Sequence, residues 1–175
     1  IPAGQTKVIA TDGLGSGGVV YDLLTNVSFN GPTSTNTAGT SNFVAGVNAG
    51  NSIQSGGNYN TVVGDEAGTA ITTGDSNVAV GYASLDANTT GGSNTAVGSA
   101  ALGANTTGNI NTAVGLSALA TNTEGLNNSA LGVNALNANT TGDDNVAIGY
   151  QALLLNTTAD DNTAVGNAAL KVNTT

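Results

Sequence analysis

The chain is organised by a short pattern of apolar and polar positions that recurs along most of its length. From Asn60 onwards the pattern restarts with a period of 17 and the consensus N-T-A-V-G-x-x-A-L-x-A-N-T-T-G-x-x, and a version that is one position longer precedes it. We number the positions of this repeat from 1, the opening Asn, to 17. The eight copies open at Asn42, Asn60, Asn77, Asn94, Asn111, Asn128, Asn145 and Asn162. A fixed short period indicates a repeat architecture.

Each copy combines strand-like segments with turn chemistry. The segment T-A-V-G is extended in character, A-L-x-A-N-T-T can supply a second short strand, and N-T-T-G would break any helix that spanned the copy. One copy is also too short for the two-helix units of α-solenoids, which need about 33 residues. The pattern predicts an all-β fold, a parallel β-solenoid (β-roll) of about eight 17-residue coils over residues 42–175. Two strands per coil would stack about 4.8 Å from their neighbours.

Stacking places equal positions of successive coils in columns. Gly fills position 5 in all eight copies, which indicates either a positive φ or the close approach of another backbone. The glycines of position 15 suit a turn with positive φ. Asn fills position 12 from Asn88 to Asn173, and stacked side-chain amides can hydrogen-bond along such a column.

The strand-like segment has two small or apolar faces. Position 3 (mostly Ala) and position 4 (mostly Val) point to opposite sides of an extended segment. One side can line the interior of the coil, and the other is then ready to meet a second chain. We therefore expect a homo-oligomer, either a homotrimer or a head-to-tail filament.

Residues 1–41 do not fit the period. Thr6–Ala10 and Val19–Leu24 resemble short strands between Gly-rich turns. Because the end of a solenoid exposes unpaired edges, we interpret 1–41 as a β-rich capping or assembly segment and 42–175 as the repeat array. In a filament, this segment of one molecule would complete the end of the next, as donor strands do.

Composition removes many functions. The 175 residues hold eleven acids, two lysines and no His, Cys, Arg, Met or Trp, for a net charge of −9. Catalytic Cys–His pairs, Ser-His-Asp triads, disulfides and His or Cys metal sites are therefore impossible. Scarce cations argue against nucleic acid and anionic membranes as partners, and no run approaches the ~20 apolar residues of a membrane-spanning helix. We expect no enzymatic activity, no resident cofactor and no membrane insertion.

Two polar features suggest binding. Asp143, Asp144, Asp160 and Asp161 form two acid pairs that are one repeat apart, so adjacent coils bring four carboxylates together. Such charges repel unless a cation lies between them, and calcium prefers oxygen ligands. The alternative is a solvated turn that supplies solubility. The Thr columns at positions 13 and 14 raise a second hypothesis, an ice-binding hydroxyl array.

Two sets of strings carry a resemblance. The strings N-T-A-V-G-x-x-A-L-x-x-N-T-T-G at Asn94–Gly108 and, with Glu124 in place of the second Thr, at Asn111–Gly125 resemble repeats of bacteriophage tail fibres. The strings N-V-A-V-G-Y-A-S at Asn77–Ser84 and N-V-A-I-G-Y-Q-A at Asn145–Ala152 are similar to head repeats of trimeric (YadA-like) autotransporter adhesins. Those heads are left-handed parallel β-rolls whose repeat is shorter than the one found here.

The resemblance implies a structural or adhesive fibre module, a homotrimer located outside the cell, on a cell surface or virion. A cell-surface glycan or receptor would be its external partner. A self-polymerising extracellular filament and an ice-binding solenoid are the alternatives.

Overall fold

The computed structural model describes residues 39–173, so most of the predicted capping segment 1–41 lies outside the described residues. Within 39–173 the regular secondary structure is eight three-residue strands, and no helix there is long and apolar enough to cross a membrane. The strands are β1 (Phe43–Ala45), β2 (Thr61–Val63), β3 (Val78–Val80), β4 (Thr95–Val97), β5 (Thr112–Val114), β6 (Ser129–Leu131), β7 (Val146–Ile148) and β8 (Thr163–Val165).

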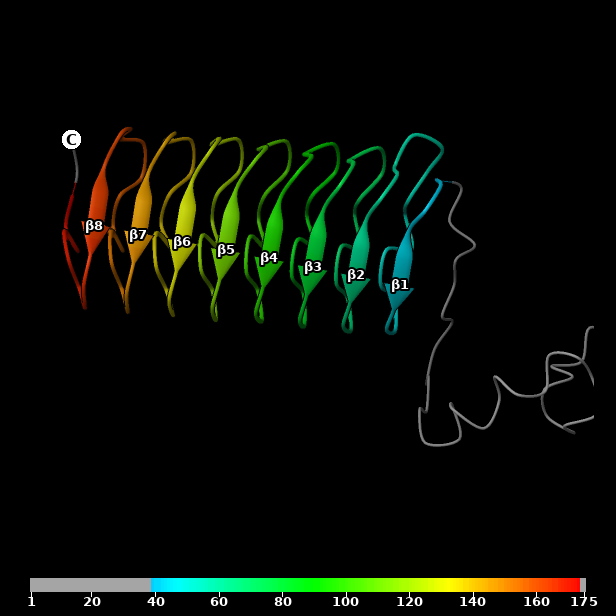
Figure 1. Ribbon diagram of the computed structural model, residues 1–175, viewed down its shortest axis with the longest axis horizontal. Coiled ribbons are helices and arrows are strands. Elements are labelled where there is room, and N and C mark those ends of the chain that lie inside the picture. Colours follow the sequence, from blue (N-terminus) through cyan, green and yellow to red (C-terminus); the bar gives the residue numbers. More distant parts are fainter. Residues whose placement is uncertain (1–38, 174–175) are drawn as a thin grey trace, which may run out of the picture. The chain divides into compact units, whose positions relative to one another are not determined.

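The eight strands form one parallel sheet in chain order, each strand paired with the equivalent strand of the next coil (Figure 1). Phe43 pairs with Thr61 across the longer first copy, and Val78 pairs with Thr95 at the spacing that all later pairs keep. The predicted all-β parallel β-solenoid, with one coil for each copy of the repeat, is confirmed.

The second strand that we expected in each coil is absent from the described array. Positions 7 and 9 take left-handed backbone conformations, as at Ala100 (φ 54°) and Leu102 (φ 50°), and these interrupt an extended segment. The backbone still pairs with the next coil: Leu102 N–H donates to Ala118 O at 3.0 Å, and Ala104 N–H donates to Ala120 O at 2.9 Å. One strand and an irregular but hydrogen-bonded return therefore make each coil.

Apolar side chains from positions 3, 8 and 9 fill most of the interior. In coils three to seven, a Leu at position 9 is fully buried beside an Ala at position 3. The first two coils fill the same space with a different set: Val62 at position 3, Gly68 at position 9 and Ile71 at position 12 in the second coil. A Cβ on Gly68 would lie 2.7 Å from Ile71 Cδ1, so Ile71 occupies the space that Leu takes elsewhere.

Two asparagine ladders hold successive coils in register. The predicted position-12 ladder is confirmed: Asn105 Nδ2 donates to Asn88 Oδ1 at 2.8 Å, and Asn122 Nδ2 donates to Asn105 Oδ1 at 2.9 Å. A second ladder, which the repeat pattern did not lead us to expect, runs along position 1. There Asn111 N–H donates to Asn94 Oδ1 at 2.9 Å, while Asn111 Nδ2 closes its own coil on Gly125 O at 2.7 Å.

The two glycine columns have different causes. At position 5 both expected features occur, since Gly115 has φ 133° and its Cβ would lie 2.6 Å from Gly132 O. The approaching backbone belongs to the next coil of the same chain. At position 15 the prediction of a positive φ is wrong. Gly108 has no such φ, and glycine is needed there because a Cβ would lie 2.5 Å from Gly125 O.

Candidate functional site

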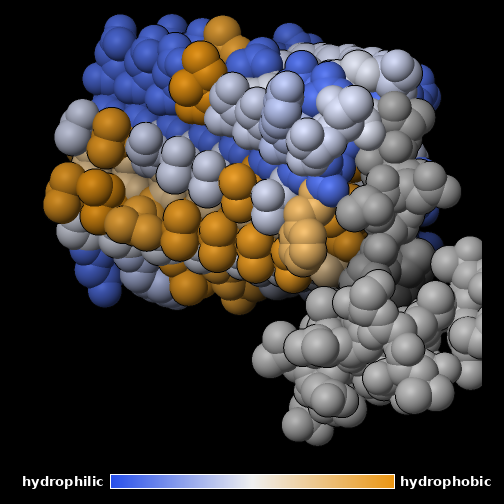
Figure 2. All heavy atoms as spheres, turned by 45° about the vertical axis from the view of Figure 1, so that its right-hand side comes forward, coloured by the Kyte–Doolittle hydropathy of each residue, from blue (hydrophilic) through white to orange (hydrophobic). Residues whose placement is uncertain are grey.

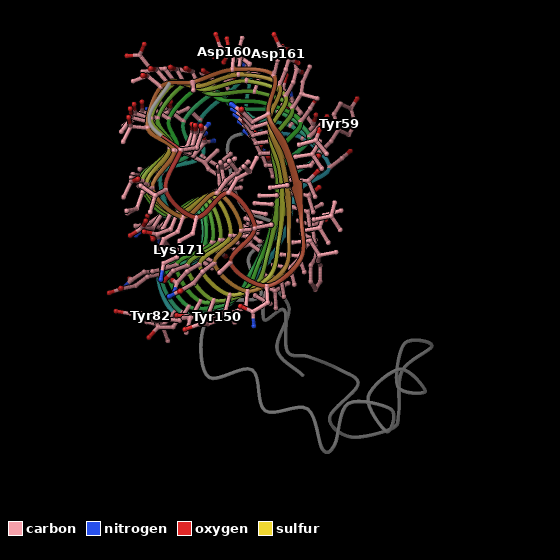
Figure 3. All side chains as sticks on the ribbon, turned by 90° about the vertical axis from the view of Figure 1, so that its left-hand side faces the viewer. Tyr59, Tyr82, Tyr150, Asp160, Asp161 and Lys171 are labelled. Atoms are coloured by element: carbon pink, nitrogen blue, oxygen red, sulfur yellow. The ribbon has the colours of Figure 1, made fainter. Side chains whose placement is uncertain are left out.

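The four predicted calcium ligands lie at positions 16 and 17 of adjacent coils, and Figure 3 shows Asp160 and Asp161 pointing outward at one corner. The two carboxylates at position 16 already have partners. Leu126 N–H donates to Asp143 Oδ1 at 2.7 Å, and Asp143 N–H donates to Asp160 Oδ1 at 2.8 Å. Asp144 and Asp161, at position 17, are exposed residues with left-handed backbone conformations.

The same contact recurs in other coils with either an acid or an amide at position 16. Asn58 N–H donates to Asp75 Oδ1 at 2.6 Å, and Gly92 N–H donates to Asn109 Oδ1 at 2.7 Å. An Asp or Asn at this position therefore serves as an oxygen acceptor for a backbone N–H, and the contact does not require a charge; Gly92 and Leu126 occupy the same position without such an acceptor. Among residues 39–173, no group of three or more acidic side chains could hold a metal ion, so the geometry gives the calcium prediction no support.

The threonine columns are largely used within the fold. At position 13 the hydroxyls from Thr72 to Thr140 donate to the carbonyl of the next coil, as from Thr89 to Thr106 O at 3.0 Å and from Thr106 to Thr123 O at 3.0 Å. The position-14 side chains are exposed, but Glu124 interrupts their column. A continuous array of free hydroxyls, which the ice-binding hypothesis requires, is therefore not formed by these two columns.

The strands show which of their two apolar faces is turned outward. Position 3 is buried in every coil, so position 4 points away from the interior. We call positions 2 and 4 of the eight strands the strand face. Exposure along position 4 reaches 50% at Leu131 and 66% at Val165, and Figure 2 shows an apolar band along the stack. The position-4 residues are Ala45, Val63, Val80, Val97, Val114, Leu131, Ile148 and Val165.

The strand face carries no charged side chain. Its position-2 row begins with the half-exposed Phe43 and continues with Thr, Val or Ser. The charged side chains of the described coils lie at positions 6, 7, 10, 14, 16 and 17. An uncharged strip, with an apolar row at position 4 and a mixed row at position 2, therefore runs along a chain whose other surfaces carry the acids.

Two exposed tyrosines lie beyond one edge of the strand face. Tyr82 and Tyr150 share position 6, and in Figure 3 both lie at the corner opposite Asp160 and Asp161. A hydrogen bond with the Glu66 carboxylate, and then the charge of that carboxylate, raise the pKa of Tyr82 above its ordinary value. The carboxylate that raises this pKa belongs to the preceding coil of the same chain.

The position-1 asparagines are the structural residues that the sequence analysis overlooked. Asn fills position 1 in all eight copies, as constantly as Gly fills position 5, and this constancy was the available signal. The comparisons add no identity: no family model, curated protein or solved structure matches the chain. The resemblance to phage tail fibres and adhesin heads accordingly stays a prediction.

Proposed function

We propose that the chain is a non-enzymatic structural module, the repeat shaft of an extracellular fibre on a virion or a bacterial surface. The observation that carries the proposal is the in-register parallel stacking of eight strands, one from each copy of the repeat, with a constant interval of 17 residues from the second strand onwards. In such an array each coil contacts only its neighbours, so the number of copies sets its length. Length is the property that a fibre shaft has to supply.

The interior supports a structural role. Its amide side chains serve the ladders, and in residues 39–173 no buried side-chain nitrogen or oxygen lacks a hydrogen-bond partner. Buried polar groups with full pairing specify one register at little energetic cost. Because the ladders and the apolar residues use the interior, external partners would bind the outer surface. A cell-surface glycan or receptor is the partner class we propose for the adhesive role.

Deletion of one coil tests the shaft proposal. Removal of residues 94–110 takes out one whole copy and should leave a folded array that is about 4.8 Å shorter by small-angle scattering. Removal of residues 94–101 takes out only part of a copy, breaks the register and should prevent folding of the neighbouring coils. If both deletions are equally harmful, the array is not modular and the proposal fails.

Electron microscopy of the intact chain separates the two assemblies. Discrete short rods support a fibre module, and filaments of indefinite length support head-to-tail polymerisation. A far-UV circular dichroism spectrum dominated by helix would contradict both.

A further inference from the structure

We propose that the strand face is the surface through which one copy of this chain binds a second copy. The inference deepens the proposed fibre function, because it names the partner and the residues of lateral assembly. It begins from the exposure of Leu131, Ile148 and Val165, large apolar side chains that point outward from consecutive strands. Continuous apolar strips on a protein surface mark sites of association.

The distribution of charge favours contact between two copies at the strand face over contact at their acidic surfaces. Two copies of a chain with net charge −9 repel each other. When they meet at the strand face, the contacting rows carry no charge, and the acids stay at the margins or on other walls of the coil. A centre depleted of charged residues with a more polar rim is the usual composition of a protein interface.

The spacing of the side chains also matches a copy of the same chain. The rows at positions 2 and 4 repeat once per coil, so each row forms ridges about 4.8 Å apart. A second copy presents the same interval along its whole length, so side chains can interdigitate at every coil. A partner with another interval would lose this match after a few coils.

The area decides how strong the pairing is. Eight strands about 4.8 Å apart and a width of four or five residues give roughly 500 Å² per copy, or about 1000 Å² for a pair. Specific interfaces usually bury about 1200 to about 2000 Å² in total, so this one lies near the lower limit. The pairing should therefore be reversible and depend on protein concentration.

The test places positive charges at the centre of the strand face. Val97→Lys with Val114→Lys should weaken self-association roughly 100-fold or more, because burying like charges against each other is costly. The matched control, Thr90→Lys with Thr107→Lys, adds the same two charges at exposed position 14 and should associate like the parent chain. Sedimentation equilibrium over a concentration series measures association, and circular dichroism checks folding.

A milder pair keeps the test valid if the lysines disturb folding. Val97→Thr with Val114→Thr uses a residue that already occupies position 2 of the same strands, and it should also weaken association. A parent chain that stays monomeric up to about 1 mM, a concentration at which even weak pairing is populated, overturns the proposal and leaves the strand face to a different partner. Strand-face variants that associate like the parent chain also overturn it. Either result leaves the shaft proposal intact, since that proposal depends on folding of the shortened array.

Discussion

Gly115→Ala should destabilise the array by forcing two adjacent coils apart. The added Cβ would lie 2.6 Å from Gly132 O and 2.7 Å from Gly132 C, closer than such atoms approach. These coils are joined next to this point by the hydrogen bond from Gly132 N–H to Val114 O, which is 2.8 Å long. Relief of the clash must lengthen this bond or shift the strands that flank it.

Two effects contribute, and a second glycine separates them. Gly115 has φ 133°, a conformation that costs a residue with a side chain about 1–3 kcal/mol. Crowding in a packed interior adds about 1–3 kcal/mol. Gly166 occupies the same position 5 with φ 131°, but the nearest atom to its Cβ is Ala169 Cβ at 3.8 Å. Gly166→Ala therefore carries the backbone strain without the clash.

We expect a loss of about 2–6 kcal/mol in the free energy of unfolding for Gly115→Ala and about 1–3 kcal/mol for Gly166→Ala. Gly103→Ala is the control without positive φ, and its closest contact, Ala100 O at 3.3 Å, should keep the change within about 1 kcal/mol. Urea unfolding followed by circular dichroism measures the free energies. Amide hydrogen exchange measures the local stability of the eighth coil, which contains Gly166. If Gly115→Ala costs no more than Gly166→Ala, close approach between coils does not explain the glycine column.

Two further substitutions test single contacts. Leu126→Asn supplies the oxygen acceptor that other coils have at position 16, so the Asn109 N–H should gain a hydrogen bond worth about 0.5–1.5 kcal/mol and exchange more slowly with solvent. Burial raises the pKa of the Asp86 carboxyl, so the folded state favours the protonated form of this group. Its contribution to the free energy of unfolding is complete below the ordinary pKa and is lost as the pH rises through the raised folded value. Asp86→Asn should therefore raise the melting temperature at pH 7 and change it little at pH 3; an equal gain at both pH values would contradict the burial argument.

The sequence was sufficient for the features that depend on repetition. A period of 17 requires equal positions to stack, which placed the position-12 ladder and the position-5 glycines correctly. It was insufficient for the return segment of each coil. Ala100 and Leu102 adopt left-handed conformations that cost about 1–2 kcal/mol each, and neither residue type signals such a conformation. Hydrogen bonds to the next coil offset that cost, and these depend on the assembled stack.

The position-16 column shows why the sequence alone does not distinguish a calcium ligand from an acceptor for a backbone N–H. The calcium prediction depends on the charges of Asp143 and Asp160, whereas the same column holds the uncharged Asn58 and Asn109 in other coils. Exchange of Asp for Asn within one column indicates a shared acceptor oxygen. The structure shows that acceptor bonded to a backbone N–H, as from Leu126 to Asp143.

Positions 3, 9 and 12 share one space in the core of each coil. Replacing these residues of the second coil with those of the later coils tests this dependence. Ile71→Asn alone should cost about 2–4 kcal/mol, because Gly68 supplies no side chain to fill the space that Ile71 leaves. Gly68→Leu alone should also destabilise, since its Cβ would lie 2.7 Å from Ile71 Cδ1. Combined with Val62→Ala, the two changes recreate the Ala, Leu and Asn set that the third to seventh coils have at positions 3, 9 and 12, and they extend the position-12 ladder by one coil. Urea unfolding should then show the triple variant within about 1 kcal/mol of the parent chain; additive losses would mean that the three positions do not share one space.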